Sequence, residues 1–499
     1  MEENIPITPE PNPEPIPHPA GKRELIFCIF SLITGLCMTN FVLYGGFHLG
    51  FAIASSLSIV SAVWYLHASG HKGDWYTRSL LSLSLILAAS FGYSSDGFVK
   101  FVLFFFLLTA VNLALCLMAG QNRRHPGGIR SLLDAPRALF SFGVAKIGLS
   151  FQSLRLFFTA GRESSRRAGA ILAGLAIAVP VLVVMIPLLM FSDAAFEGLM
   201  DLLPEFEFSE AYVTVLWGTV LFAILYSRSV ALHHTADARQ PESRGKGLHL
   251  FTVNTLLSVV CLLYCVYLFS QVAYFSGGFL GILPDGYAVA EYARRGFFEM
   301  ALLSGINLGL ITFGVGMVSG HGAVKNSTKY LCLFIGLITL FLIGASFAKM
   351  LLYIGTYGLT RLRVLTMAII TFLALTTILV CVWLFIPKIP YMKFVMLLAL
   401  TIGAVVVWMD VDTVVARYNV EGYLSGQIAT IDTAHLGELG DGALPYVAQL
   451  TTVDDPEIVQ TARNLVNYWY IYNPEDFRSW SYINHSVQQY DTFNRRHTP

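Results

Sequence analysis

The sequence predicts an all-α fold: a polytopic transmembrane helix bundle of about 11 spans with a small C-terminal extracytoplasmic helical domain. Three observations lead to this prediction. Of the 499 residues, 55% are hydrophobic and only 13% are charged, roughly half the charged share of an ordinary soluble domain. The apolar residues fall into long runs. The basic residues are concentrated in alternate loops, as expected when these loops stay on one face of a membrane.

Composition divides the chain into three regions. Residues 1–21 are rich in Pro and Glu, and we expect a disordered cytoplasmic tail because proline favours extended polyproline II. Residues 22–409 contain the apolar runs and form the predicted bundle. In residues 410–499, aromatic and polar residues replace those runs, and we expect an extracytoplasmic domain. Its predicted helices are residues 412–427, 433–450, 456–470 and 474–490.

The predicted spans follow from length, because a membrane helix needs roughly 20 apolar residues. One run, residues 79–92, is short and rich in serine, and the count falls to about ten if it does not cross. The spans are placed at residues 25–43, 46–66, 79–92, 98–119, 168–191, 211–228, 249–270, 297–318, 330–352, 364–386 and 394–408.

Lys and Arg predict the orientation. With the N-terminus in the cytoplasm, most of the 32 basic residues fall on the cytoplasmic side, many of them in residues 121–167. The opposite side has few. Because cytoplasmic loops carry the excess of Lys and Arg, we expect a cytoplasmic N-terminus. An odd number of spans then places the C-terminus outside the cytoplasm.

A cytoplasmic segment, residues 129–163, has its own pattern. Polar residues recur on one side of a helix, while Leu and Phe lie off that side. This spacing predicts an amphipathic helix on the inner leaflet, with arginines facing anionic headgroups; a helix packed on other cytoplasmic loops remains an alternative. Lys146 falls off the polar side, which predicts a break near Gly143 or Gly148.

Common catalytic and nucleotide-binding motifs are absent. The chain contains no G-x-x-x-x-G-K-[ST], G-x-S-x-G or H-E-x-x-H. His233 and His234 are adjacent, and adjacent residues on a helix do not face each other. We therefore expect no metal or other cofactor and no nucleic-acid partner, and we favour a protein that is not an enzyme. The lipid bilayer is the one partner that the sequence indicates.

A polar cluster is predicted where several spans reach the outer face. Charged groups at the edge of a bilayer are costly to leave unpaired. One interpretation is an ion-pair network that docks the C-terminal domain onto the bundle, and another is a functional cleft. The candidate residues are Glu291, Tyr292, Arg294, Arg295, Glu299, Lys349, Tyr353, Tyr357, Arg361, Arg363, Asp410, Asp412 and Arg417.

Asparagines interrupt three of the spans. Asn112, Asn254 and Asn307 lie within predicted helices, and polar groups at such depth usually form hydrogen bonds between helices. A translocation path is the alternative. No Asp, Glu, Lys or Arg is predicted at mid-membrane, and this argues against an ion-coupled transporter.

Short strings spread along residues 192–481 carry a resemblance. E-Y-A-R-R-G-F-F-E at 291–299 is similar to a Y-A-R-x-G-F-x-E signature, and Y-G-L-T at 357–360 with Arg363 is similar to Y-G-L-T-x-x-R. These belong to a bacterial polytopic membrane family catalogued as a domain of unknown function (four-one-seven-three, related to four-one-five-three). The similarity spans about residues 170–484. Further matching elements are Ser192 to Phe196, Gln271 with Tyr274 and Phe275, Arg417 to Asn419, Ile431-Asp432, Ala443 to Pro445 and Arg478 to Ser481, while Lys349 and His435 depart from the expected Arg and Tyr.

The resemblance implies a protein of the bacterial inner (plasma) membrane without an assigned activity. Our leading hypothesis is a non-enzymatic sensing or scaffolding protein at the outer face, in which the polar cluster is mutually satisfied. A transporter is the first alternative, and it requires a water-filled path lined by Asn307 or Asn254. A membrane-embedded transferase acting on a lipid-linked substrate is the second, and it requires an outer cavity with Glu299, Lys349 or Asp410 unpaired.

Overall fold

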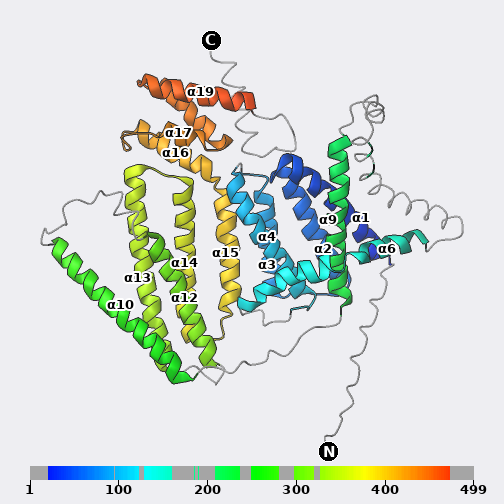
Figure 1. Ribbon diagram of the computed structural model, residues 1–499, viewed down its shortest axis with the longest axis horizontal. Helices are drawn as coiled ribbons and strands as arrows, with labels where there is room; N and C mark the ends of the chain where they lie inside the picture. The colour runs from blue at the N-terminus through cyan, green and yellow to red at the C-terminus, as the bar shows by residue number, and fades with distance from the viewer. Residues whose placement is uncertain are drawn as a thin grey trace, which may run out of the picture.

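The computed structural model describes residues 21–94, 96–122, 129–159, 208–235, 249–279, 297–319 and 326–472, together with Met185 and Leu189. All regular elements within these ranges are helices (Figure 1). Eight helices in the described part are long and apolar enough to cross a membrane. The all-α class with membrane-type helices is therefore confirmed.

Most predicted spans correspond to helices of the structure. Residues 168–191 lie outside the described residues. Helix α3 has 16 residues, and the apolar part of α12 is the shorter Glu299–Val315, so the count of about 11 stays a prediction. The helices are α1 (Lys22–Asn40) continued by the π-helical η1 (Phe41–Gly45), α2 (Leu49–Ala68), α3 (Trp75–Ser90), α4 (Gly97–Met118), α9 (Phe208–His234), α10 (Leu250–Phe279), α12 (Phe297–Ser319), α13 (Asn326–Tyr357), α14 (Arg361–Phe385) and α15 (Tyr391–Trp408).

The helices pack in two groups joined by α15. In the first group, α1 packs against α2 and α9, and Phe27 of α1 stacks on Tyr65 of α2 with ring centroids 4.7 Å apart. In the second group, α13 contacts α10, α12 and α14. Helix α15 packs on α3 on one side and on α14 on the other. Large apolar side chains point outward, such as Phe269 at 78% exposure, as expected of helices that face lipid.

The three asparagines form hydrogen bonds between helices. Asn307 accepts from Tyr264 Oη at 2.7 Å and donates to Thr339 Oγ1 at 2.9 Å. Asn254 likewise bonds Ser327 and Thr328 of α13. These bonds are what polar groups at depth are expected to make.

One charged residue lies deeper than the sequence predicts. Helix α9 continues to His234, more than a turn beyond the predicted end at Arg228. The guanidinium of Arg228 is therefore buried in the bundle, where it donates to Asn112 Oδ1 at 3.1 Å. Arg228 lies six residues before the end of α9, so the expectation of no charged residue at mid-membrane stays a prediction.

The segment after α4 is broken where the sequence predicts a break, and some of its polar side chains face protein. A turn at 145–147 separates η3 from α6, at the predicted break. Asp134 is buried, and Arg137 donates to Gln121 O at 2.9 Å, whereas Phe140 is 61% exposed. Asp134 and most of the Arg137 side chain thus face protein in the described part, because α4 packs on residues 134–137, whereas Ser141 and Gln152 of the predicted polar side are exposed. The elements are η2 (Ile129–Leu133), α5 (Asp134–Arg137), η3 (Ala138–Val144) and α6 (Gly148–Thr159).

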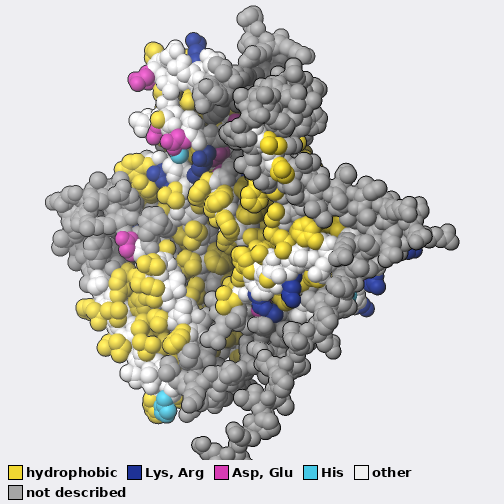
Figure 2. Space-filling view, turned by 45° about the vertical axis from the view of Figure 1, so that its right-hand side comes forward, with side chains coloured by type: hydrophobic (Ala, Val, Ile, Leu, Met, Phe, Trp, Pro, Cys, Tyr) yellow, Lys and Arg dark blue, Asp and Glu magenta, His cyan; other side chains and the backbone are white. Residues whose placement is uncertain are grey.

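Short helices lie across one end of the bundle (Figure 1). The single helix predicted at 433–450 is wrong: the chain forms several short helices there. The first ends at Gly437 and the next begins after Gly440, and both glycines are poor helix formers. The predicted helix at 474–490 lies outside the described residues. Figure 2 shows hydrophobic side chains over the middle of the molecule, charged side chains of both signs toward this end, and a further group of Lys and Arg lower on the same face. The elements are α16 (Val411–Leu424), α17 (Thr433–Gly437), η4 (Asp441–Ala443), α18 (Leu444–Val447), η5 (Ala448–Thr452) and α19 (Pro456–Tyr472).

Candidate functional site

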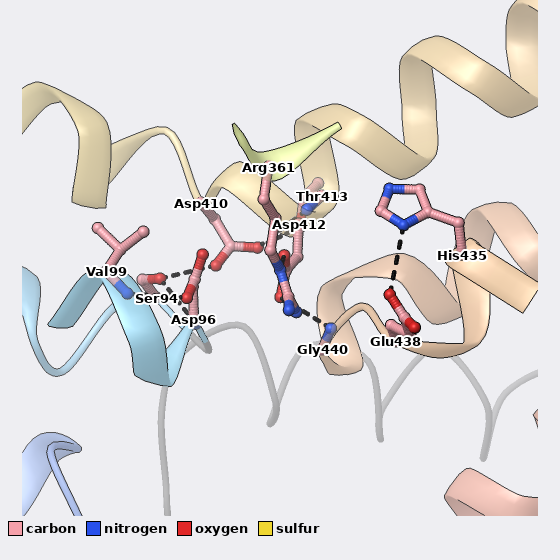
Figure 3. Close-up of polar contacts among 10 residues, drawn as sticks. All are labelled: Ser94, Asp96, Val99, Arg361, Asp410, Asp412, Thr413, His435, Glu438 and Gly440. Atoms are coloured by element: carbon pink, nitrogen blue, oxygen red, sulfur yellow. Dashed lines mark hydrogen bonds and ion pairs between the residues drawn. The ribbon is translucent and has the colours of Figure 1, made fainter. Parts of the chain in front are cut away.

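A fully buried carboxylate connects the bundle to the C-terminal helices. Asp412 lies in the first turn of α16, where a negative charge is favourable. Arg361 at the start of α14 binds both of its oxygens, with Nη2 2.6 Å from Oδ2 and Nε bonded to Oδ1 (Figure 3). The backbone N–H of Gly440 donates to Oδ2 at 2.8 Å. Three segments distant in sequence therefore meet at Asp412.

Asp410 makes a second connection, to the α3–α4 loop. It is the only non-glycine residue of the described chain with positive φ, at 47°, a conformation that costs energy for an L residue. Its Oδ1 accepts from Ser94 Oγ at 2.8 Å. Its Oδ2 accepts from the N–H and the hydroxyl of Thr413, which caps α16. We call the group Ser94, Asp96, Arg361, Asp410, Asp412 and Gly440 the junction.

Asp96 is the least satisfied carboxylate of the junction. Its Oδ1 caps α4 by accepting from Val99 N at 3.0 Å, while Oδ2 is buried and accepts no hydrogen bond from a described residue. Burial and the charges of Asp412 and Asp410 raise the pKa of Asp96. Burial and the same two carboxylates also raise the pKa of Asp441. Negative charge is therefore concentrated around Arg361.

A buried lysine lies one turn from Asp96 on α4. Lys100 is fully buried, and its Nζ lies 3.4 Å from His48 Nδ1. Burial, followed by the charge of Lys100, lowers the pKa of His48 to about 4. His48 is consequently neutral near neutral pH, and its ring nitrogen can accept a hydrogen bond from the lysine.

The α13–α14 loop is held by an asparagine of α16. Asn419 Oδ1 accepts from Leu359 N at 2.7 Å, and its Nδ2 donates to Leu359 O at 2.7 Å. Gly358 has φ of +74°, and a Cβ there would lie 2.4 Å from Asn419 Oδ1. The close approach of this loop to α16 therefore requires glycine at position 358.

A cavity of about 560 Å³ lies beside this loop. Arg363 enters it from α14; its Nη1 donates to the carbonyls of Tyr357 and Gly358, and its guanidinium lies 4.1 Å from the ring centroid of Tyr353. Two acidic residues, Asp432 and Glu438, line the part formed by the C-terminal helices. The lining residues are Tyr357, Gly358, Leu359, Thr360, Arg363, Asn419, Ile428, Thr430, Ile431, Asp432, Ala434, His435 and Glu438.

The predicted site residues separate into several groups. Arg361, Asp410 and Asp412 meet at the junction, and Tyr357 and Arg363 line the cavity, with Tyr353 stacked on the arginine.

The other predicted residues lie apart from these two groups. Arg417 pairs with Glu421 at 3.0 Å on the exposed face of α16. Glu299 is exposed and has no hydrogen bond or ion pair with another described residue, and Lys349 is half-buried on α13. The remaining candidates, Glu291, Tyr292, Arg294 and Arg295, lie outside the described residues.

Sequence reasoning missed several members of the junction. Asp96 followed by Gly97 at the start of an apolar run is a helix N-cap signal, and it would have placed Asp96 at the same end of the bundle as the other junction charges. Ser94 and the N–H of Gly440 carry no such signal, because a backbone donor has no sequence signature. Within the described ranges, no group of three His, Cys, Asp or Glu residues is placed to hold a metal ion.

Eight apolar helices of membrane-crossing length, capped at one end by a hydrogen-bonded charged layer, define a polytopic integral membrane protein. Residues 79–450 match the family model described as "Domain of unknown function (DUF4153)", and the chain belongs to this family. The sequence resemblance named this family, domain of unknown function four-one-five-three, as a relative of domain four-one-seven-three. No curated protein and no solved structure matches the chain. The matched residues include the junction and the whole lining of the cavity.

Proposed function

We propose that this integral membrane protein is not an enzyme and that it senses or scaffolds at the outer face of a bacterial inner membrane. The observation that supports this proposal is Asp412, which is fully buried and binds Arg361 of the bundle and Gly440 of the C-terminal region together. Such an arrangement suits a mechanical connection, since a carboxylate with all its bonds to protein has little capacity left for chemistry.

The proposed orientation has support from the distribution of charge. Lys72, Arg78, Lys388 and Lys393 lie in or beside the two loops at the end of the bundle opposite the junction, where Lys393 Nζ is 3.4 Å from Asp74 Oδ2. Cytoplasmic loops carry such an excess of basic residues. Helix α4 ends at this basic end, and α9 begins near the junction end (Figure 1). The chain between them must therefore cross the membrane once, as it does if residues 168–191 form a span.

The alternatives have weaker support. A transport path would be lined by Asn307 or Asn254, and both are engaged in hydrogen bonds between helices. A transferase would hold Glu299, Lys349 or Asp410 unpaired in an outer cavity. Asp410 accepts bonds from Ser94 and Thr413, and none of the three residues lines the described cavity. Contact of residues 129–163 with anionic lipid remains part of the proposal, through arginines other than Arg137.

Replacement of Asp412 by asparagine in the full-length protein tests the connection. The amide leaves Arg361 without a counter-charge, and loss of one partner of a buried pair costs about 2 kcal/mol or more. We expect faster cleavage of the C-terminal helices in limited proteolysis, with the bundle intact.

Glu421→Gln is the matched control, because it breaks only the exposed Arg417–Glu421 pair on the same helix, and exposed pairs contribute little. If Asp412→Asn and Glu421→Gln were digested at the same rate as the wild type, the proposed connection would be refuted.

A further inference from the structure

The floor of the cavity lies at the boundary of the membrane. Residues 357–360 connect two apolar helices, Asn326–Gly355 and Arg361–Phe385, both of membrane-crossing length. A loop between the ends of two spans lies at the depth of the lipid headgroups. Leu351, Leu352 and Leu362 on these spans are more than half exposed, so acyl chains can lie directly below the cavity.

The wall supplied by the bundle presents a fixed cation. Arg363 is oriented by the carbonyls of Tyr357 and Gly358 and by the ring of Tyr353. These contacts use one terminal nitrogen and one face of the guanidinium. Its Nε and Nη2 make no hydrogen bond with the described residues. A guanidinium held in this way is a bidentate donor suited to phosphate.

The wall supplied by the C-terminal helices presents negative charge. Asp432 caps α17 through one oxygen, which accepts from His435 N at 3.0 Å. Glu438 lies 3.6 Å from His435 Nδ1, and its side chain is 76% exposed (Figure 3). Both carboxylates retain oxygens that can accept from a primary ammonium, whereas a trimethylated ammonium has no N–H to donate.

These walls are complementary to a zwitterion, with one cation beside the membrane and two anions farther out. The cavity volume is also in the usual range for small-molecule sites. We propose that the cavity binds the headgroup of a phospholipid that carries a primary amine, with its phosphate on Arg363 and its ammonium on Asp432 and Glu438. The inference rests on the proposed function for the outer orientation, and it names what that function would sense.

Binding to the purified full-length protein in detergent tests the inference, with native mass spectrometry as the readout. The probes are phosphatidylethanolamine, phosphatidylcholine and phosphatidylglycerol with identical eight-carbon chains. We expect phosphatidylethanolamine to bind about tenfold more tightly than the other two. Equal affinity for all three would overturn the proposal. A fourth probe, free phosphoethanolamine, separates the sources of the headgroup: affinity equal to that of the lipid would assign a soluble ligand instead.

Two sets of variants divide the site into its halves. Arg363→Gln should weaken all three lipids about tenfold, while Arg417→Gln, which removes an exposed arginine outside the cavity, should leave binding unchanged. Asp432→Asn with Glu438→Gln should reduce only the preference for the amine, because asparagine still caps α17. Glu421→Gln is the control for this pair. An unchanged preference in the double variant would contradict the assignment of the ammonium.

The lipid-binding experiment and the proteolysis of Asp412→Asn can succeed or fail independently of each other. If Asp412→Asn loosens the C-terminal helices but the lipids bind equally, the headgroup site is refuted and the connection stands. If the lipids bind as expected while Asp412→Asn has no effect on proteolysis, the connection is refuted and the site stands.

Discussion

At the scale of single residues, Asp412 and Asp96 are both buried carboxylates of one cluster with opposite contributions to stability. Asp412 has three hydrogen bonds from two partners. Asp96 has an oxygen without a described partner, and its pKa is raised by burial and by Asp412 and Asp410. A raised pKa means that the folded state binds the proton more tightly than the unfolded chain does. The contribution of Asp96 to stability is therefore present below its ordinary pKa and is lost as the pH rises through the raised value.

Asp96→Asn should raise the melting temperature at neutral and alkaline pH. The amide oxygen still caps α4 at Val99 N, and the buried negative charge is removed. The gain should shrink as the pH falls, because the wild-type carboxyl is then protonated as well. Thermal unfolding in detergent between about pH 4 and about pH 8 measures this. A lower melting temperature at about pH 8 would show that Asp96 is needed as an anion, for instance by Lys100.

Topology predicted some of these residues and missed others for a physical reason. Arg361, Asp410 and Asp412 were found because charged groups at the ends of spans share one depth. The contact between Ser94 and Asp410 joins loops that are far apart in the sequence, and depth alone does not give lateral proximity. Asp96 carried a cap signal that was available, whereas Gly440 acts through its backbone.

At the scale of elements, the α13–α14 loop is a tight connection whose geometry depends on a partner helix. Asn419 satisfies both the N–H and the carbonyl of Leu359, as a neighbouring strand would. Gly358 makes the approach possible through its positive φ and its missing side chain. Helices here were predictable from apolar runs. The break between Gly437 and Gly440 was also readable from its glycines, whereas the bond from Gly440 to the distant Asp412 was not.

Gly358→Ala and Gly426→Ala separate backbone strain from steric contact. Both glycines have positive φ, at +74° and +73°, but a Cβ at Gly426 meets nothing within 4 Å. Gly426→Ala should cost about 1 kcal/mol. Gly358→Ala should cost at least about 2 kcal/mol more, since the methyl group displaces Asn419 and breaks two hydrogen bonds. Thermal unfolding of both variants measures the difference; equal destabilisation would mean that the loop accommodates the methyl group.

At the scale of the whole molecule, the bundle and its order along the chain were predictable, while its lateral arrangement was not. Lipid-facing and helix-facing apolar side chains have the same composition, so nothing in the sequence places α15 between α3 and α14. Asp134 and Arg137 illustrate the same point. Their spacing is compatible with an outward polar side or with a helix packed on other loops, and the packing of α4 covers these two residues.

The orientation of the bundle is testable with fused reporters. An enzyme reporter that is active only outside the cytoplasm should be active after Pro499. The same reporter inserted after Lys388, in the loop between α14 and α15, should be inactive. Activity after Lys388 together with inactivity after Pro499 would invert the orientation, and inactivity at both sites would contradict the odd number of spans.

The cavity has walls from both the spanning helices and the C-terminal helices, so a ligand in it can influence how these two parts are held together. A ligand that contacts both walls binds most tightly when the C-terminal helices are attached to the bundle. By thermodynamic reciprocity, the bound ligand stabilises that attachment by the same free energy. The attachment of the C-terminal helices is then a property of the protein and its ligand jointly. Proteins with identical sequences in bilayers of different headgroup composition would differ in how firmly the C-terminal helices are held.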